Sequence, residues 1–219
     1  MASHAQSDHA ETRERILRSS ERLFSEKGYD GTSIRDITAE AECNVAAVNY
    51  HFGGKDNLYV ETFRRLLIDL RDRRISSMRR DMSNVADPTL EHFLESFVNA
   101  FLEPLVDGSR GRLLLSFFAN EMTGAHLPPG LFLDEFIRPM VLVTTEGLDR
   151  TGPPLDPMTA RMCMMSIVGQ LLHTLKALPY FSNPEGPHMV PTNLGDHIQH
   201  VVRFSAGGIR ACAATEEAP

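Results

Sequence analysis

The sequence predicts an all-α protein with a small N-terminal three-helix domain and a larger C-terminal helical bundle. Apolar residues recur at helical spacing in successive segments, and short stretches containing Gly, Pro, Asn or Asp separate these segments. No segment alternates polar and apolar residues as a β-strand would. We expect a disordered leader at residues 1–11, a helix-turn-helix domain at 12–57 and the bundle at 58–219.

The composition is that of an ordinary globular protein, with 219 residues, 42% hydrophobic and 23% charged. No apolar run approaches the roughly 20 residues that span a bilayer, and the N-terminus has no secretory signal. The three cysteines, Cys43, Cys163 and Cys212, are far apart and lack C-x-x-C spacing, which argues against a disulfide framework or a zinc site. We therefore expect a cytoplasmic protein without membrane contact.

The net charge of -7 argues against bulk attraction to nucleic acid, but the charge is unevenly distributed. Residues 58–80 contain seven Arg and three acidic residues, whereas residues 1–57 contain seven basic and ten acidic residues. A surface for DNA must therefore come from the placement of side chains. The Arg cluster is either a solvated helix face or a set of groups that act near DNA or in ion pairs.

Three short helices are predicted near the N-terminus. The first covers Thr12 to Lys27, with Ile16, Leu17, Ser20, Leu23 and Phe24 facing inward and Gly28 as its C-cap. The second begins at Ser33, which forms a capping box with Asp36, and ends near Ala41. Its predicted inward residues are Ile34 and Ile37.

The third short helix has the character of a DNA-reading helix. Asn44 is a good N-cap, and Val45 and Val48 can face inward. Its other side chains are small or can form hydrogen bonds, as do the side chains that approach base edges and phosphates in DNA complexes. After Gly53-Gly54, Lys55 lies in the first turn of the next helix, where its ammonium and free N–H groups can bind a phosphate.

The segment resembles the DNA-binding domain of the TetR/AcrR family of bacterial repressors. The resemblance lies in the order of a capped helix, a turn, and the motifs N-x-x-x-V-N-Y-H-F, G-G-K and N-L. The resemblance covers about Arg13 to Phe63 and includes Phe24, Gly28, Thr32, Ile37, Tyr50, His51, Phe52, Lys55 and Leu58. Glu42 departs from the pattern, because the family usually has Gly there, and a positive φ at Glu42 would be strained; a shifted turn is the alternative. The expected DNA-binding residues are Ser33, Arg35, Asn44, Val45, Ala46, Ala47, Asn49, Tyr50, His51 and Lys55.

The rest of the chain consists of longer helices. Pro139 should kink or divide one of them, and a Pro- and Gly-containing loop at residues 182–191 precedes the last. The predicted segments are Lys55–Arg80, Thr89–Val106, Arg110–Met122, Leu131–Asp149, Met158–Leu178 and Asn193–Cys212.

The C-terminal half resembles the larger domain of a TetR subgroup, in the phrases RLLLSFFANEM, FIRPM, CMMSIVGQ and VVRFSAGGIRA. That resemblance implies that the last two helices pair with their twofold mates in a homodimer. The alternative is that the same residues serve only the core of one chain. The expected interface residues are Ile167, Leu171, Leu175, Val201, Phe204 and Gly208.

The ten Met and twelve Phe residues suit an adaptable apolar cavity for a small, largely apolar effector, although they suit a plain core equally well. The family resemblance favours the effector. The expected pocket residues are Phe97, Phe101, Phe118, Glu121, Met122, Phe136, Met140, Met165, Gln170 and His173.

An enzyme is not expected. The sequence has no phosphate-cradling Gly-rich motif, and His188, His197 and His200 lack the partners of a metal site. No cofactor is therefore predicted. The resemblance implies a ligand-responsive repressor that binds a palindromic operator in double-stranded DNA as a homodimer, and the alternative is a constitutive DNA-binding protein without an effector.

Overall fold

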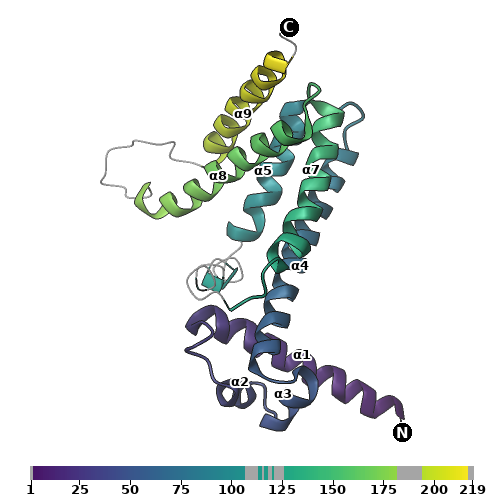
Figure 1. The fold of residues 1–219 in the computed structure, drawn as a ribbon, viewed down its shortest axis with the longest axis vertical. Coiled ribbons are helices and arrows are strands. Elements are labelled where there is room, and N and C mark those ends of the chain that lie inside the picture. Colours follow the sequence, from purple (N-terminus) through teal and green to yellow (C-terminus); the bar gives the residue numbers. More distant parts are fainter. Residues whose placement is uncertain are drawn as a thin grey trace. The chain divides into compact units, whose positions relative to one another are not determined.

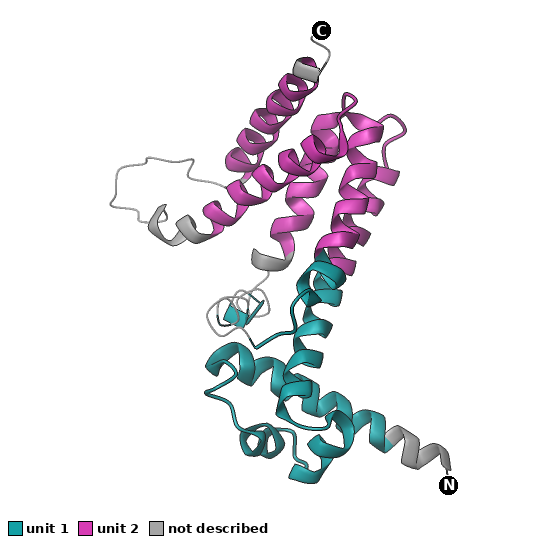
Figure 2. Cartoon of the chain, in the orientation of Figure 1, with its two compact units in different colours: residues 1–70, 104–136 teal, residues 71–103, 137–219 magenta. Residues whose placement is uncertain are grey.

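The computed structural model describes residues 2–106, 113–114, 116–117, 120, 126–181 and 194–216. All regular secondary structure in these ranges is helical, so the predicted all-α class is confirmed (Figure 1). The chain divides into two compact units, coloured separately in Figure 2. The first consists of Met1–Leu70 and Pro104–Phe136, and the second of Arg71–Glu103 and Ile137–Pro219.

The first unit contains α1 (Ala2–Lys27), α2 (Ile34–Glu40), α3 (Val45–Phe52) and the first part of α4 (Lys55–Ser83). Each helix contributes an apolar stripe to one core, because residues three and four apart share a helix face. The buried residues of this core include Ile16, Leu17, Leu23, Phe24, Ile37, Val48, Leu58, Tyr59 and Phe63.

Helix α1 is longer at its N-terminus than the sequence analysis predicted. It begins at Ala2, whereas the prediction placed the start at Thr12 after a disordered leader. No Gly or Pro precedes Gly28, so no residue between 2 and 27 interrupts the hydrogen-bond ladder. Residues 2–11 therefore belong to the first helix.

Aromatic rings connect the 104–136 segment to the core of the first unit. Phe117 is 1% exposed, and its ring centroid lies 5.2 Å from that of Tyr59 and 5.1 Å from that of Phe63. Tyr59 in turn packs edge-on against Phe24 at 4.8 Å. The described part of the predicted helix 110–122, which includes Leu114 and Phe117, is helical at these two residues.

The second unit contains the rest of α4, most of α5 (Leu90–Val106), α7 (Arg138–Thr151), α8 (Pro157–Phe181) and α9 (Leu194–Glu216). The predicted division near Pro139 is confirmed, since a π-helical turn, η1 (Leu133–Ile137), precedes α7, whose first turn holds this proline. Pro lacks the N–H that a helix interior needs but fits a first turn.

One basic side chain is buried in the second unit. The Arg74 Nη2 donates a hydrogen bond to the Phe101 carbonyl oxygen at 3.0 Å, and the guanidinium lies 4.0 Å from the centre of the Phe101 ring. Burial lowers the pKa of Arg74 to about 9, so the group stays charged at neutral pH. Arg74 therefore does not lie on a solvated helix face.

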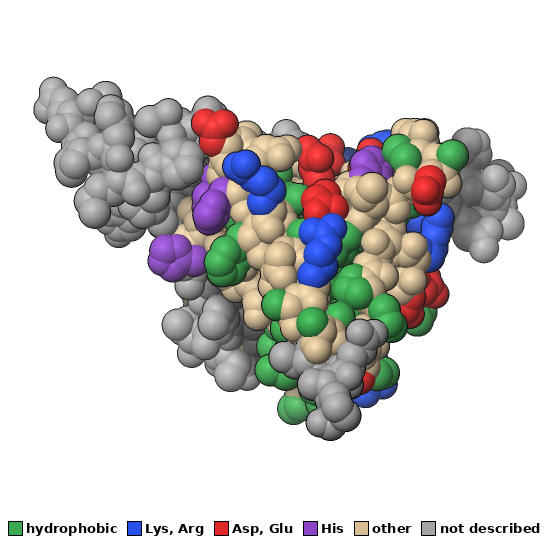
Figure 3. Space-filling view, turned by 90° about the horizontal axis from the view of Figure 1, so that it is seen from above, with side chains coloured by type: hydrophobic (Ala, Val, Ile, Leu, Met, Phe, Trp, Pro, Cys, Tyr) green, Lys and Arg blue, Asp and Glu red, His purple; other side chains and the backbone are tan. Residues whose placement is uncertain are grey.

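The face of the protein drawn in Figure 3 carries both charge types. Basic side chains lie beside acidic ones there, and hydrophobic side chains lie among them. Arg210 of α9 and Glu91 of α5 form such a pair, with Nη1 2.7 Å from Oε1. Among the helices that the structure describes, none is both long and apolar enough to cross a membrane.

Candidate nucleic-acid interface

The N-terminus of α2 has the predicted capping box. The Ser33 Oγ accepts a hydrogen bond from the Asp36 backbone N–H at 3.1 Å, and the Asp36 carboxylate accepts one from the Ser33 N–H at 3.0 Å. The Ser33 hydroxyl also donates to the Asp36 carboxylate at 2.7 Å, and this hydrogen bond and the one from the Ser33 N–H lower the pKa of the Asp36 carboxyl. The cap satisfies two otherwise unpaired N–H groups and fixes where the helix-turn-helix begins.

The turn between α2 and α3 contains a residue in the left-handed conformation. Glu42 has a φ of 51°, so the chain adopts the strained conformation at this position. The Cys43 N–H donates to the Thr38 carbonyl at 3.0 Å and closes the turn. Burial raises the pKa of the Cys43 thiol, which disfavours the reactive thiolate needed for thiol modification.

Helix α3 presents an open face. The Asn44 Oδ1 caps the helix by accepting from the Ala47 N–H at 2.9 Å, which leaves the amide NH₂ of Asn44 as a donor. Val48 is fully buried, whereas Val45 is 44% and Tyr50 73% exposed. The prediction that Val45 faces inward is therefore wrong, because only residues 48 and 52 of this short helix face the core.

Most of the predicted DNA-binding residues are exposed to solvent. Ser33, Arg35, Asn44, Val45, Ala46, Asn49 and Tyr50 are exposed, and Ala47, His51 and Lys55 are half-buried. None of the ten is buried, as a set of DNA contacts requires. The contacts themselves remain a prediction.

Two glycines turn the chain from α3 into α4. Gly53 is the C-cap of α3 at φ 77°, and Gly54 has φ 136°, both in the region that favours glycine. The N–H groups of the first turn of α4 have no acceptor within the helix, and Lys55 lies in that turn. The Lys55 Nζ lies 4.0 Å from the centre of the Tyr29 ring. An ammonium and several N–H donors therefore gather at one helix end, which is a favourable place for a phosphate.

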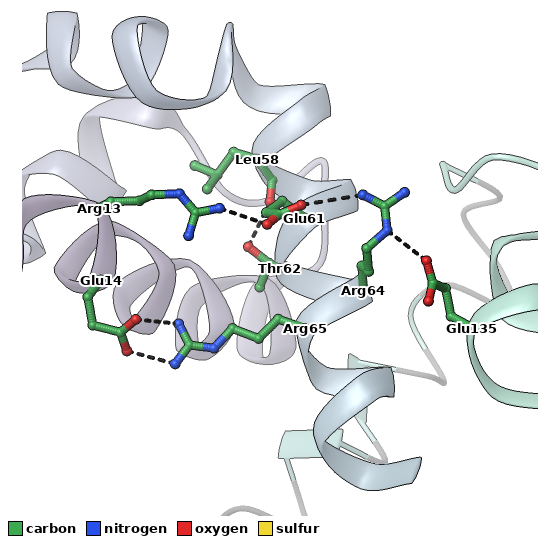
Figure 4. A network of polar contacts seen from close by, with 8 residues as sticks. All are labelled: Arg13, Glu14, Leu58, Glu61, Thr62, Arg64, Arg65 and Glu135. Atoms are coloured by element: carbon green, nitrogen blue, oxygen red, sulfur yellow. Dashed lines mark hydrogen bonds and ion pairs between the residues drawn. The ribbon is translucent and has the colours of Figure 1, made fainter. Parts of the chain in front are cut away.

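Ion pairs join α4 to α1 and to η1 (Figure 4). The Arg65 guanidinium donates to both carboxylate oxygens of Glu14 at 2.7 Å, and this hydrogen bonding lowers the pKa of the Glu14 carboxyl. The Arg64 Nε lies 3.2 Å from the Glu135 Oε1, and Glu61 pairs with Arg13 at 2.7 Å. Arg64 and Arg65 therefore form ion pairs within the first unit, which is one of the alternatives given for the Arg cluster.

The sequence analysis missed a contact made by the N-terminal part of α1. The His9 ring centroid lies 5.6 Å from that of Tyr50 and 5.9 Å from that of His51. Burial, with smaller effects of His9 and Arg13, lowers the pKa of His51. The prediction of a disordered leader hid this contact, although the absence of Gly and Pro before residue 12 was an available signal that the helix could begin earlier.

The described residues of the predicted effector pocket are distributed over both units. Phe97, Phe101 and Met140 are buried in the second unit, whereas Phe136 is buried in the first. Met165 is 74% exposed and His173 is exposed, so neither lines an interior in one chain. Gln170 is half-buried. Phe118, Glu121 and Met122 lie outside the described residues.

The predicted dimer residues fall into two groups. Ile167, Leu171 and Val201 are at most 2% exposed within one chain, which favours the alternative of an intrachain core for these three. Phe204 is 65% exposed, Leu175 is half-buried, and a Cβ added at Gly208 would meet nothing within 4 Å.

Among the described residues, no group of three or more His, Cys, Asp or Glu side chains could hold a metal ion. His197 instead lies 2.6 Å from the Thr174 hydroxyl through its Nε2, and the His200 ring stacks on Phe204.

Two family models match the chain. Residues 16–62 match the model described as bacterial regulatory proteins, tetR family, and residues 90–209 match the C-terminal domain of the HTH-type transcriptional dual regulator CecR. Over 86 residues the chain is 33% identical to IcaR of Staphylococcus aureus strain Newman, the negative transcriptional regulator of the biofilm operon icaADBC. That match covers 39% of this chain and 45% of IcaR. The chain thus spans less than half the length of the curated relatives it matches.

Solved structures share the fold. A TetR family transcription regulator from Marinobacter aquaeolei VT8 aligns with a TM-score of 0.66 at 14% identity, covering 93% of this chain and 98% of that one. The multidrug binding protein EbrR, complexed with imidazole, aligns at 0.59 and 20% identity, covering 89% and 94%. Since family models match both the helix-turn-helix and more than half of the chain beyond it, the chain belongs to the TetR family of bacterial regulatory proteins.

Proposed function

We propose that this chain is a ligand-responsive transcriptional repressor that binds a palindromic operator as a homodimer and is released by a small, largely apolar effector. The observation that supports DNA binding best is the open face of α3, which begins at a capped N-terminus and is followed by Lys55 at the start of α4. Residues 12–57 would form the DNA-binding domain, and residues 58–219 the effector-binding and dimerisation domain. Its DNA partner would place the protein in the cytoplasm.

The predicted contacts have two roles. The Asn44 amide and the small Ala46 side chain lie where a helix N-terminus meets base edges, whereas Lys55 and the Tyr50 hydroxyl suit phosphates. Loss of one phosphate contact lowers the slope of log affinity against log salt by roughly 0.9. Lys55→Ala should therefore weaken binding to all DNA sequences alike and reduce this slope.

A change at Asn44 should instead alter base preference. Asn44→Ala would also remove the N-cap of α3, which stabilises the helix by about 1 kcal/mol, so a loss of folding stability could not be told apart from the loss of a base contact. Asn44→Ser keeps an oxygen that accepts from the Ala47 N–H but lacks the amide donor, and is the cleaner variant. Equal losses on every sequence with Lys55→Ala and with Asn44→Ser would contradict the assignment of roles.

Exposed apolar side chains on the last two helices support a homodimer. Met162 and Met165 of α8 are 61% and 74% exposed, and Phe204 of α9 is 65% exposed. Gly169 of α8 and Gly208 of α9 have open space where a side chain would stand. Water-exposed apolar groups beside backbone open to close approach are typical of helix pairs between subunits.

The proposed effector response is supported by the family and by the fold similarity to EbrR, a multidrug binding protein. The buried rings of Phe97 and Phe101, with centroids 6.3 Å apart, are the candidate lining residues in the second unit. An effector releases DNA only if it binds the DNA-incompetent arrangement better, and a tenfold loss of operator affinity needs about 1.4 kcal/mol of such coupling. Helix α4 runs through both units and can transmit it.

Selection of bound genomic fragments tests the DNA-binding part of the proposal. An inverted repeat whose half-sites follow helical-turn spacing is expected, because one α3 per subunit must meet related half-sites. Recovery of no inverted repeat, or full-affinity binding by a monomer, would contradict it.

A thermal-shift screen of apolar metabolites and antibiotics tests the effector response. Compounds that raise the melting temperature are then assayed for release of the operator. If they bind without changing operator affinity, the result favours the alternative of a constitutive DNA-binding protein.

A further inference from the structure

The segment between α5 and η1 contacts the α1–α2 connection at two points. The Asn120 amide donates to the carbonyl oxygens of Phe24 at 3.5 Å and Ser25 at 3.2 Å, near the C-terminus of α1. The His126 ring stacks on the Tyr29 ring, with centroids 4.3 Å apart and planes at 25°. Both residues lie in the sequence that matches the CecR C-terminal domain, yet they belong to the compact unit of the helix-turn-helix.

The Tyr29 ring has two close neighbours. The Lys55 Nζ lies 4.0 Å from its centre, and the His126 ring centre lies 4.3 Å from it. The Tyr29 hydroxyl donates a hydrogen bond to the Asp56 carboxylate, which raises the pKa of Tyr29 to about 12. Tyr59 packs against the ring edge-on at 5.1 Å.

This arrangement favours a fixed position for the Lys55 ammonium. A hydroxyl that donates to a carboxylate increases the negative charge of the ring face, which strengthens its attraction for a cation. A cation over a ring still has N–H donors that point away from it. Because a lysine loses rotamer freedom when it binds, an ammonium that is already ordered binds a phosphate at a lower entropic cost.

We propose that Tyr29 and His126 are positioning residues for Lys55, so that the segment before η1 adjusts the phosphate contact of the DNA-binding domain. The inference rests on the proposed function, in which Lys55 binds a DNA phosphate. His126 acts through the Tyr29 ring and makes no DNA contact itself. The stack connects the C-terminal sequence to the helix-turn-helix domain by a route that does not require tilting of α4.

The test is a double-mutant cycle on operator affinity, measured by fluorescence anisotropy over a salt series. His126→Ala and His126→Leu remove the flat ring, and His126→Phe keeps it and is the matched control. Each change is also made together with Lys55→Ala. We expect both ring-less variants to bind the operator about threefold more weakly, because a Lys55 side chain that is less ordered beforehand loses more freedom when it binds the phosphate, and His126→Phe to bind like the unaltered protein. In the Lys55→Ala background, all three changes should have no further effect.

The outcomes separate the inference from the proposed function. If Lys55→Ala leaves affinity and salt slope unchanged, the phosphate contact is wrong, and the stack has no contact to position. If Lys55→Ala weakens binding but His126→Leu does not, or weakens it equally with and without Lys55, the inference is wrong while the proposed function stands. Melting temperatures identify a variant that loses affinity by unfolding, and the Leu variant, closer in volume to His, decides the case if the Ala variant melts early.

Discussion

Glu42 is the residue at which this helix-turn-helix carries measurable backbone strain. A left-handed φ costs a non-Gly residue roughly 1–2 kcal/mol, and the φ of Glu42 is 51°. Gly removes this cost but adds roughly 0.5–1 kcal/mol of chain entropy to the unfolded state. The Glu42 side chain is exposed, and in the described part of the chain it has no hydrogen bond or ion pair to lose. Glu42→Gly should therefore stabilise the protein by about 0.5–1 kcal/mol.

Urea and thermal unfolding followed by circular dichroism measure this effect. For a protein of this size, the expected rise in melting temperature is about 1–4 °C. Glu42→Ala is the matched control, because it removes the same carboxylate but keeps the strained φ, and it should bring no such gain. If Ala stabilises as much as Gly, the gain comes from the charge and not from the backbone, and the reasoning is refuted.

Three further predictions concern packing, pH and assembly. Gly147→Ala should destabilise by about 1–3 kcal/mol, measured by urea unfolding, because its Cβ would lie 2.0 Å from a ring carbon of the buried Phe93; unchanged stability would refute this packing. Because Arg65 lowers the Glu14 pKa in the folded state, Glu14→Gln should reduce stability at pH 7, and its difference from the unaltered protein should vanish as the pH falls below about 4. A pH-independent difference would contradict this origin. Phe204→Glu should shift the protein towards monomer in analytical ultracentrifugation while its melting curve stays cooperative, and an unchanged mass would place the dimer interface elsewhere.

The helix-turn-helix could be predicted from sequence because its determinants are local. The capping box at Ser33, the cap at Asn44 and the glycine pair before Lys55 are each set by residues within four positions, and the structure has all three. Val45 was misplaced because a helix of two turns has too few apolar residues to define its inward direction. The DNA contacts depend on a partner and stay predictions.

The inward face of α8 was harder to predict because apolar residues lie nearly all round this helix. In α8, Met164, Ile167 and Leu171 are buried, whereas Met162 and Met165 are exposed. Both groups have helical spacing, so periodicity in the sequence could not decide which faces inward. The same ambiguity placed Met165 in the predicted pocket and Ile167 in the predicted dimer interface.

The ring contacts of Phe117 have a consequence for chimeric regulators, in which the DNA-binding domain of one protein is joined to the effector-binding domain of another. A junction at residue 70 would separate Phe117 from Phe24, Tyr59 and Phe63, whose rings lie within 6.4 Å of it. The transplanted DNA-binding domain would then expose part of its own core to water. An exchangeable DNA-binding unit from this chain includes residues 104–136 as well as residues 1–70, so a working chimera needs junctions after residues 70, 103 and 136 and not a single junction after residue 70.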